Sequence, residues 1–300
     1  MRDFGKVGVL MGGRSPEREI SLMSGKEVLE ALLASGVDAH PLDVGSECYE
    51  QIRSGKFDRL FNILHGGEGE DGTIQGLLEF LNIPYTGSGV LASALAMDKI
   101  RSKDIFRARH LPTPKAVMID LNQALLPQIE KLKFPLAVKP VNGGSTIGLS
   151  KVLVPEAFSA AVELAKQYGA VMAEEWVEGQ EFTVGVVGDR VLPSIRIEAR
   201  GGCYDFQQKY FVKTSSYYCP SGLNPQEEAH LAKMCQEAFE ALEARHWGRF
   251  DLMRDSQGDF YFLEFNTIPG MTPNSLVPKA AKAIGWSFPE TVLKVLEQTL

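Results

Sequence analysis

Residues 7–44 read VGVLMGGRSPEREISLMSGKEVLEALLASGVDAHPLDV, and they set the class of fold expected for the first part of the chain. Residues 7–11 form an apolar run typical of a buried strand, and residues 39–42 predict a second strand. Between them, residues 17–34 carry apolar side chains at helical spacing. A strand, a helix and a strand in this order predict a parallel sheet covered by helices.

The same alternation continues to about residue 95, with a third strand expected at 59–64 and a helix at 72–81. In an open parallel sheet, ligands bind beyond the carboxyl ends of the strands. Two glycine-rich runs follow such ends: residues 12–17 read GGRSPE and residues 65–72 read HGGEGEDG. We therefore expect a ligand site where these runs meet. They also account for part of the glycine content, which is 29 of 300 residues and exceeds the usual share of about 7%.

Composition and charge limit the class of protein. A hydrophobic fraction of 44% and a charged fraction of 23% are ordinary for globular domains and exclude a disordered or fibrous chain. With 31 basic and 38 acidic residues, the net charge is −7. The chain therefore lacks the basic composition of a general nucleic-acid binder. The length favours two domains of about 150 residues each.

Targeting and redox features of the sequence are few. No apolar run approaches the roughly 18 residues that a membrane span needs, and the first residues predict a strand rather than a signal peptide. The cysteines, Cys48, Cys203, Cys219 and Cys235, form neither a CxxC pair nor a zinc pattern, which favours free thiols. We therefore expect a cytoplasmic protein that binds neither nucleic acid nor membrane.

Beyond residue 95 the strands and helices follow a mixed order. Residues 181–199 alternate apolar and polar side chains around a turn at 188–189, as an antiparallel hairpin does. Residues 200–222 form a polar loop without periodicity, and loops of this length are usually functional. The other expected elements are a helix at 92–109, strands at 116–119, 136–140 and 170–177, a helix at 226–244, strands at 248–253 and 260–266, and two short terminal helices.

The last two expected strands carry a candidate metal site. Arg249 and Asp251 share one face of the first strand, and Glu264 and Asn266 share one face of the second, because alternate residues of a strand point the same way. Hard oxygen ligands of this kind suit Mg²⁺ held together with substrate phosphates. The alternative is a solvated polar face on an edge hairpin. The opposite faces would carry Phe250 and Leu252 on the first strand and Tyr261, Leu263 and Phe265 on the second.

Two glycine-rich segments could contact phosphate. Lys139 ends an apolar strand and precedes residues 143–148, which read GGSTIG and could cover phosphates with backbone N–H groups. A plain hairpin turn is the alternative. The chain has no Gly-Lys-Ser or Gly-Lys-Thr, so a Walker-type loop is excluded. Residues 86–92 resemble a dinucleotide fingerprint, but a turn that begins the next helix is the favoured interpretation.

Two further groups remain open from the residues alone. Glu174, Trp176 and Glu181 lie in and after a strand and could line an adenosine site, although such residues are more often core and surface. His65 could be a general acid or base, or merely a hydrogen-bonded loop residue.

Taken together, these motifs resemble bacterial D-alanine–D-alanine ligases along the whole chain. The matching stretches are residues 12–21, 65–76, 97–99, 181–184, 248–251, 264–272 and 275–276. The resemblance implies an ATP-grasp fold, which combines an α/β Rossmann-like N-terminal domain with two α+β domains. It also implies domains at 1–95, 96–180 and 181–300, with residues 200–222 as a lid over the phosphates. By the same resemblance we expect a homodimer.

The resemblance further implies the reaction. ATP would phosphorylate the carboxylate of one D-alanine, and the amine of a second D-alanine would displace the phosphate. The product, D-alanyl-D-alanine, would serve peptidoglycan synthesis. Two Mg²⁺ or Mn²⁺ ions and several lysines would neutralise the phosphates.

Roles for individual residues follow from the motif matches. Two metal ions would be held by Asp251, Glu264 and Asn266. The nucleotide would contact Lys99, Lys139, Glu174, Trp176, Val177, Glu181 and Lys209. The catalytic group would comprise Glu17, Ser145, Tyr210, Arg249 and Gly270, with Arg249 and the Gly270 N–H on the oxyanion. The two D-alanines would contact His65, Ser275 and Leu276.

The resemblance leaves alternatives for substrate and activity. Tyr210 would bridge to Ser145 and Glu17 in a closed lid, and relatives that accept D-lactate tend to lack this tyrosine. A D-alanine–D-lactate or D-alanine–D-serine ligase is the nearest alternative. A catalytically silent ATP-binding regulator, or an ATP-grasp ligase of unrelated substrates, is more distant. Glu68 differs from the uncharged or basic residue that relatives often carry.

Overall fold

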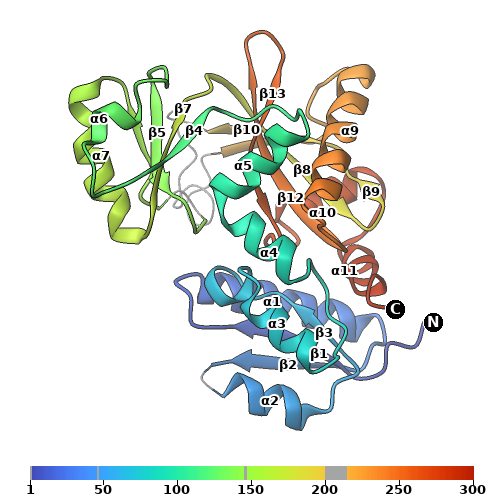
Figure 1. The fold of residues 1–300 in the computed structure, drawn as a ribbon. Helices are drawn as coiled ribbons and strands as arrows, with labels where there is room; N and C mark the ends of the chain where they lie inside the picture. Colours follow the sequence, from blue (N-terminus) through green and yellow to red (C-terminus); the bar gives the residue numbers. More distant parts are fainter. Residues whose placement is uncertain (1, 46, 145–146, 200–214) are drawn as a thin grey trace.

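A computed structural model describes residues 2–45, 47–144, 147–199 and 215–300 of the chain. In this part the strands form three sheets, one parallel and two antiparallel. Figure 1 shows the parallel sheet at one end of the molecule and the two antiparallel sheets side by side at the other. The expected combination of α/β and α+β domains is confirmed.

The parallel sheet is built by the first part of the chain, in the order β2-β1-β3. Strand β1 is completely buried because it is central and apolar. Strand β3 is shorter than expected, and Ile63 and Leu64 continue as a buried segment. The elements are β1 (Val7–Gly12), α1 (Arg18–Ala34), β2 (Ala39–Val44), α2 (Cys48–Gly55), β3 (Arg59–Asn62), η1 (Gly67–Gly69) and α3 (Thr73–Phe80).

The central antiparallel sheet has the order β4-β7-β5-β6 and is covered on one side by short helices. The expected strands at 116–119, 136–140 and 170–177 are present, the last with slightly different bounds. The elements are β4 (Ala116–Ile119), α6 (Leu125–Gln128), β5 (Leu136–Pro140), β6 (Ser150–Val152), η2 (Pro155–Ala157), α7 (Phe158–Ala165), η3 (Lys166–Tyr168) and β7 (Val171–Glu175).

The C-terminal antiparallel sheet has the order β11-β10-β8-β12-β13, with β9 also paired to β8. The expected hairpin around residues 188–189 is confirmed by the pairing of β8 with β9. The elements are β8 (Gly179–Val187), β9 (Arg190–Val191), β10 (Ile195–Ala199), β11 (Ser215–Tyr218), α9 (Pro225–Ala241), β12 (Trp247–Asp255), β13 (Phe260–Asn266), α10 (Leu276–Ala283) and α11 (Phe288–Glu297).

The single helix expected at 92–109 is wrong, because two helices occupy this segment. They are α4 (Val90–Met97) and α5 (Lys99–Ala108). Asp98 between them is extended, and its carboxylate accepts hydrogen bonds from the N–H groups of Ile100 and Arg101. An aspartate at this position caps a new helix rather than continuing the old one.

The expected alternation along residues 260–266 is also wrong in part. The register between β12 and β13 shifts at Asp251/Leu252, so Leu263 is the extra residue of a β-bulge. The buried side chains of β13 are consequently Phe260, Phe262 and Phe265, and Leu263 faces a cavity together with Glu264. Phe250 and Leu252 are completely buried, as expected.

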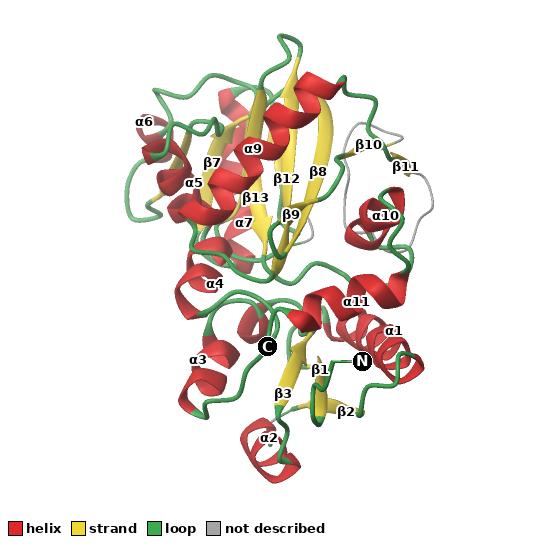
Figure 2. Ribbon diagram, turned by 90° about the vertical axis from the view of Figure 1, so that its right-hand side faces the viewer, coloured by secondary structure: helices red, strands yellow, loops and turns green. Residues whose placement is uncertain are grey.

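The hydrophobic cores show which parts of the molecule are packed together. One core contains residues of the parallel sheet and α1 together with residues of the C-terminal sheet, α10 and α11. Figure 2 shows α11 between the two sheets, next to α1. The central sheet has a hydrophobic core of its own, formed with its own helices by residues 117–173. Among the described residues, no helix has the length and apolar character to cross a membrane.

Candidate functional site

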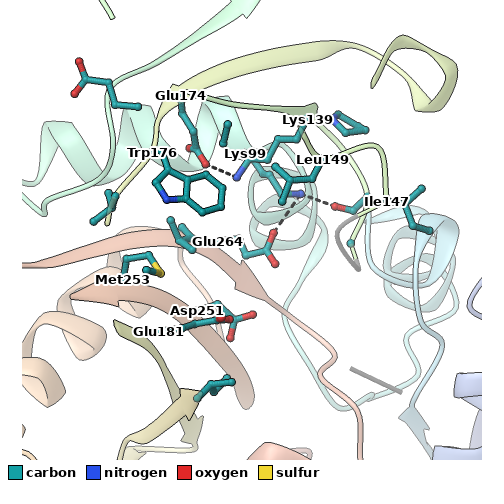
Figure 3. A pocket seen from close by; sticks show the side chains of 18 of the residues that line it. Lys99, Lys139, Ile147, Leu149, Glu174, Trp176, Glu181, Asp251, Met253 and Glu264 are labelled. Carbon is teal, nitrogen blue, oxygen red and sulfur yellow. Dashed lines mark hydrogen bonds and ion pairs between the residues drawn. The ribbon is translucent and has the colours of Figure 1, made fainter. Parts of the chain in front are cut away.

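A cavity of about 520 Å³ lies between the central and the C-terminal sheets. Figure 3 shows its lining, with Glu174 and Trp176 on one side and Glu181 and Asp251 on the other. The central sheet and the C-terminal sheet therefore form two walls of one pocket. Eight of the expected site residues line it: Lys99, Lys139, Glu174, Trp176, Val177, Glu181, Asp251 and Glu264.

The wall formed by the central sheet carries a buried chain of charges. Lys139 on β5 contacts one oxygen of Glu174 on β7, the strand paired directly with β5. The second carboxylate oxygen lies 2.9 Å from Nζ of Lys103. Burial raises the pKa of Glu174, but the charges of Lys103 and Lys139 outweigh it and hold that pKa below its usual value. Glu174 is therefore ionised at neutral pH.

Lys103 was not expected in the site. Its side chain has no exposed surface, and burial lowers the pKa of its ammonium to about 8, against the opposing charge of Glu174. The sequence did offer a signal, because Lys103 lies four residues after Lys99 and therefore on the same face of α5.

Lys99 is the first residue of α5, and its side chain contacts segments of both antiparallel sheets. Its Nζ donates to the backbone carbonyl of Gly143, in the loop after β5, and lies 3.3 Å from Oε2 of Glu264 on β13. The side chain is mostly buried, yet it lines the cavity. An ammonium placed here can attract phosphate oxygens.

Part of the cavity lining is apolar. The ring of Trp176 lines it, and the Lys151 ammonium lies 4.5 Å from the centre of that ring. Val177 and Met253 also line the cavity. A flat apolar slot beside backbone hydrogen-bonding groups suits an adenine ring.

Asp251 is the centre of a hydrogen-bond network on the other wall. Arg249 donates to both carboxylate oxygens, from Nε at 2.8 Å and from Nη2 at 2.7 Å. Asn266 donates from Nδ2 to Oδ2 at 3.0 Å, which confirms that the two strands bring these side chains together. Thr183 on β8 donates its hydroxyl to Oδ1 at 2.8 Å. Thr183 lies in the matching stretch 181–184, but no role was predicted for it.

The donor set of this wall fits a divalent cation. Asp251 and Glu264 are directly paired across β12 and β13, and Asn266 adds an amide. Two carboxylates and an amide, completed by phosphate oxygens, match the preference of Mg²⁺. Within residues 2–45, 47–144, 147–199 and 215–300, no group of three or more His, Cys, Asp and Glu side chains could hold a metal by itself.

The two glycine-rich runs of the parallel sheet lie against each other, as expected. They line a second cavity of about 510 Å³. The Ser15 hydroxyl donates to the carbonyl of His65 at 2.5 Å and accepts from the N–H of Glu17 at 3.1 Å. A Cβ added at Gly66 would lie 3.1 Å from one oxygen of Glu17, and a Cβ at Gly144 would lie 3.5 Å from the other. Glu17 therefore stands between the parallel sheet and the central sheet.

His65 is buried and joins two parts of the molecule. Its Nδ1 lies 2.9 Å from the carbonyl of Ile268, and its Nε2 lies 3.4 Å from the Ser24 hydroxyl. Burial lowers the pKa of His65 to about 4, so the ring is neutral at neutral pH. Because a carbonyl only accepts, Nδ1 carries the proton. His65 thus fixes the loop after β13 against the parallel sheet.

Glu70 is a second residue near the site that was not expected. Its Oε2 accepts a hydrogen bond of 2.7 Å from the N–H of Gly66. Burial raises the pKa of Glu70 to about 8, and the charge of Glu17 adds to this effect. The carboxyl is therefore largely protonated at neutral pH. The burial of Glu70 could not be predicted from the sequence, because an acid in a polar loop normally faces solvent.

The loop between β13 and α10 carries the last expected group. The Ser275 hydroxyl accepts from the N–H of Thr272 at 3.0 Å. A Cβ added at Gly270 would lie 3.2 Å from this hydroxyl, so the two residues are neighbours. Leu276 is the first residue of α10. Ser145, Lys209 and Tyr210 lie outside the described residues.

The arrangement combines three chemical elements. Lys99 and Lys139 reach the large cavity, each paired with a carboxylate, Asp251 and Glu181 line it from the C-terminal sheet, and Trp176, Val177 and Met253 give it an apolar surface. A nucleotide triphosphate and its counter-ions match this distribution of charge. Glu17 and Arg249 both lie close enough to Glu70 for their charges to act on it.

Comparison with known proteins gives full-length matches. The chain is 50% identical over 299 residues to the D-alanine–D-alanine ligase of Chromohalobacter salexigens, with coverage of 99% of this chain and 95% of that protein. It is 50% identical over 295 residues to the D-alanine–D-alanine ligase of Nitrosospira multiformis, with coverage of 98% and 96%.

Solved structures agree with these matches. The VanG D-Ala:D-Ser ligase of Enterococcus faecalis superposes with a TM-score of 0.87 at 30% identity over 100% of both chains. A D-alanine–D-alanine ligase of Bacillus anthracis complexed with ATP gives 0.87 at 29% identity, over 98% of this chain and 97% of that one. Residues 45–88 match the family described as D-ala D-ala ligase N-terminus, and residues 105–297 match D-ala D-ala ligase C-terminus. The chain therefore has the ATP-grasp fold and belongs to the D-alanine–D-alanine ligase family.

Proposed function

We propose that this protein joins two D-alanine molecules into D-alanyl-D-alanine and converts ATP to ADP and phosphate. The observation that carries the proposal is the charge distribution of the 520 Å³ cavity, in a chain with this family membership. Lys99 and Lys139 reach a cavity that is also lined by the carboxylates of Asp251 and Glu264, and this combination of groups suits a nucleotide triphosphate with cations. A role in peptidoglycan precursor synthesis follows from the product.

The reaction proceeds in two steps. The carboxylate of the first D-alanine attacks the γ-phosphorus of ATP, so ADP leaves and an acyl phosphate forms. The amine of the second D-alanine then attacks the acyl carbon, phosphate leaves, and the amine loses its proton. The first step brings two anions together, and the second develops negative charge on the acyl oxygen, so the protein must supply positive charge.

Nucleotide binding is assigned to the large cavity. Trp176, Val177, Glu174 and Glu181 would surround the adenosine. Lys99 and Lys139 would contact the phosphates, since both ammonium groups reach the cavity. Lys209 is expected at the γ-phosphate from the motif match.

Asp251, Glu264 and Asn266 would hold two Mg²⁺ or Mn²⁺ ions. These ions would neutralise the developing charge on the transferred phosphoryl group. Arg249 now balances the charge of Asp251, and Asp251 holds the guanidinium plane in place.

The acyl-transfer chemistry is assigned to the region between the three sheets. Glu17 would bind the ammonium of the first D-alanine, and His65 would support its binding loop. The N–H of Gly270 and the guanidinium of Arg249 would stabilise the oxyanion. Ser275 and the N–H of Leu276 would bind the carboxylate of the second D-alanine. The motif match adds Ser145 and Tyr210 as the residues that close the lid.

A substrate panel tests the function. Phosphate release is measured with ATP and Mg²⁺ in the presence of D-alanine alone, D-alanine with D-lactate, D-alanine with D-serine, and L-alanine as the control. We expect release with D-alanine alone and formation of the dipeptide, seen by mass spectrometry. Release only with a mixed pair would replace the proposed second substrate.

Removal of the metal tests the ion site. With EDTA in place of Mg²⁺, phosphate release should stop, and Mn²⁺ should restore it. Turnover that continues at an unchanged rate in EDTA would contradict the assignment of Asp251, Glu264 and Asn266.

Two properties extend the proposal. We expect a homodimer, to be measured by light scattering, since two-fold assemblies are the commonest. We also expect a cytoplasmic location, where ATP is available.

A further inference from the structure

Helix α5 carries two lysines one helical turn apart, and both contact the walls of the cavity. Figure 1 shows α5 beside the two antiparallel sheets. Lys99 lines the cavity and pairs with Glu264 of the C-terminal sheet. Lys103 has no exposed surface and contacts Glu174 of the central sheet and Phe262 of the C-terminal sheet. Lys103 therefore acts from behind the wall, where it cannot touch a ligand.

The surroundings of Lys103 satisfy its charge. Three oxygen atoms lie near Nζ: Oε2 of Glu174 at 2.9 Å, Oγ1 of Thr113 at 3.0 Å and the carbonyl of Phe262 at 3.2 Å. The oxygens of Thr113 and Phe262 accept hydrogen bonds from the ammonium, and the Glu174 carboxylate pairs with it by charge. A buried lysine with such partners keeps its proton when a carboxylate is among them.

Lys103, Glu174 and Lys139 form a row in which exposure increases toward the cavity. The side chains are 0%, 4% and 14% exposed in that order. The row holds two cations and one anion. A buried carboxylate is stable when one cation remains paired with it, and it is strongly destabilising when none does. The row therefore contains one cation more than Glu174 requires, and Lys139 is the cation that reaches the cavity.

We propose that Lys103 is a positioning residue for nucleotide binding: it keeps Glu174 paired from behind, so Lys139 can leave that carboxylate and bind a phosphate of the nucleotide. This inference rests on the proposed function only in that a nucleotide enters the large cavity. In the absence of Lys103, the move of Lys139 toward phosphate would leave Glu174 buried without a cation. Lys139 would then stay on Glu174, and the nucleotide would bind weakly.

A purely structural role is the alternative. Lys103 also contacts Thr113 and Phe262, and these contacts tie the connection before β4 to β13. Loss of these ties would reduce stability whatever the charge of Glu174. The two roles differ in one respect: only the positioning role depends on the carboxylate of Glu174.

The experiment measures binding of ADP with Mg²⁺ by isothermal titration calorimetry, without D-alanine. Lys103→Met should weaken ADP binding by about tenfold or more, since a buried charge pair is broken. In phosphate release, KM for ATP should rise similarly, whereas kcat and KM for D-alanine should stay within about threefold. Lys103→Arg retains the charge and should recover most of the affinity.

A double-mutant cycle separates the two roles. Glu174→Gln removes the charge that holds Lys139. In that background, the addition of Lys103→Met should change ADP affinity by less than about threefold, since no carboxylate remains to be paired. The matched control is Arg107→Met, one turn further along α5, whose exposed side chain pairs with Asp104. This control should bind ADP as the unchanged protein does, and circular dichroism checks the fold of every variant.

Three outcomes would overturn the inference. These are unchanged ADP affinity in folded Lys103→Met, effects of Lys103→Met and Glu174→Gln that simply add, and affinity lost equally in Lys103→Arg. If Lys103→Met alone fails to fold, the double variant with Glu174→Gln buries no unpaired charge and should fold; its failure would also favour the structural role. ADP binding needs no amino acid, so a failed D-alanine panel leaves this test intact.

Discussion

The two walls of the large cavity are both antiparallel sheets, yet they differ in charge and in attachment. The wall of the central sheet presents Lys139 next to a slot formed by Trp176, and the C-terminal wall presents Asp251 and Glu264. Both kinds of side chain can take part in phosphate binding. Lysines bind phosphate directly, and carboxylates bind the cations that accompany it. The cavity therefore offers both the lysines and the carboxylates that a nucleotide with its metal ions would use.

The attachment of the walls differs as well. The C-terminal sheet shares one hydrophobic core with the parallel sheet, and Trp247 and Phe61 pack in that core with their rings 6.4 Å apart. The central sheet has a core of its own. The wall formed by the C-terminal sheet is thus part of the larger packed unit, which also carries Glu17 and His65. The wall formed by the central sheet belongs to a unit that we expect to respond separately to mutation. The following predictions test this contrast, from the largest expected effect to the smallest.

The largest effect is expected from Arg249, on the wall formed by the C-terminal sheet. Arg249→Ala should lower kcat by about 10²–10³-fold, the usual cost of losing one donor to an oxyanion. The loss also leaves Asp251 without its bidentate partner. Phosphate release with D-alanine is the measurement, and Arg254→Ala on the same strand is the control. A loss smaller than about tenfold would remove Arg249 from the oxyanion role.

The second prediction concerns separate stability of the central sheet. Leu136 is completely buried in the core of that sheet. Leu136→Ala should destabilise that unit by about 2–5 kcal/mol, the range for such cavities. Hydrogen exchange should show faster opening in residues 116–175 and little change in the parallel sheet. Uniform acceleration across the chain would mean that the three-domain division proposed at 95/96 and 180/181 does not describe its cooperative units.

The third prediction uses the titration of His65 within the larger unit. Its pKa is about 4 in the folded protein because of burial, against an ordinary value of 6.5. The unfolded chain therefore binds more protons between these values, so stability is present above pH 6.5 and is lost as the pH falls through 4. The loss amounts to about 3 kcal/mol at most.

His65→Gln should remove this part of the pH dependence. Urea unfolding at several pH values measures it, and the difference between the two proteins isolates the histidine. Glu70 has the opposite sign, since its pKa rises from 4.5 to about 8 and its contribution falls as the pH increases. Parallel curves for His65→Gln and the unchanged protein would contradict a neutral buried ring.

The smallest effect is expected at the outer edge of the shared unit. Arg245, just before β12, donates to Glu79 at 2.8 Å and to the Tyr85 hydroxyl at 2.9 Å. The charged groups are about half exposed, so Arg245→Ala should cost about 1 kcal/mol or less. Thermal unfolding measures it, and high salt should reduce the difference. A much larger loss would show that this contact, rather than the shared core, holds the two sheets together.

Some of the site could be predicted without the structure because strand periodicity is a local property. The pattern of residues 248–266 placed Arg249 beside Asp251 and Asn266 opposite them, and the hydrogen bonds agree. The βαβ pattern of residues 7–44 likewise gave the parallel sheet and the position of its glycine-rich loops. The helix break at Asp98 and the β-bulge at Leu263 were not predicted. In each case a local feature, the helix cap at Asp98 or the shifted pairing with β12, interrupts a regular periodic pattern.

The roles of Lys103 and Glu70 could not be predicted, because they depend on burial. A lysine in an amphipathic helix and a glutamate in a polar loop normally face solvent, where their pKa values are ordinary. Only the packing of α5 between two sheets puts Lys103 next to Glu174. Only the closeness of two loops raises the pKa of Glu70.

By itself, the sequence determined the order of strands and helices, the family, and which residue types follow which strands, since these depend on neighbours along the chain. The tertiary structure alone decided that the two antiparallel sheets line one cavity, where lysines and carboxylates from separate segments meet. It also decided that the C-terminal sheet shares its core with the parallel sheet, and that a buried lysine stands behind the wall of the cavity. These features depend on distances between segments far apart in sequence, where desolvation and pairing of charges are set by the packing as a whole.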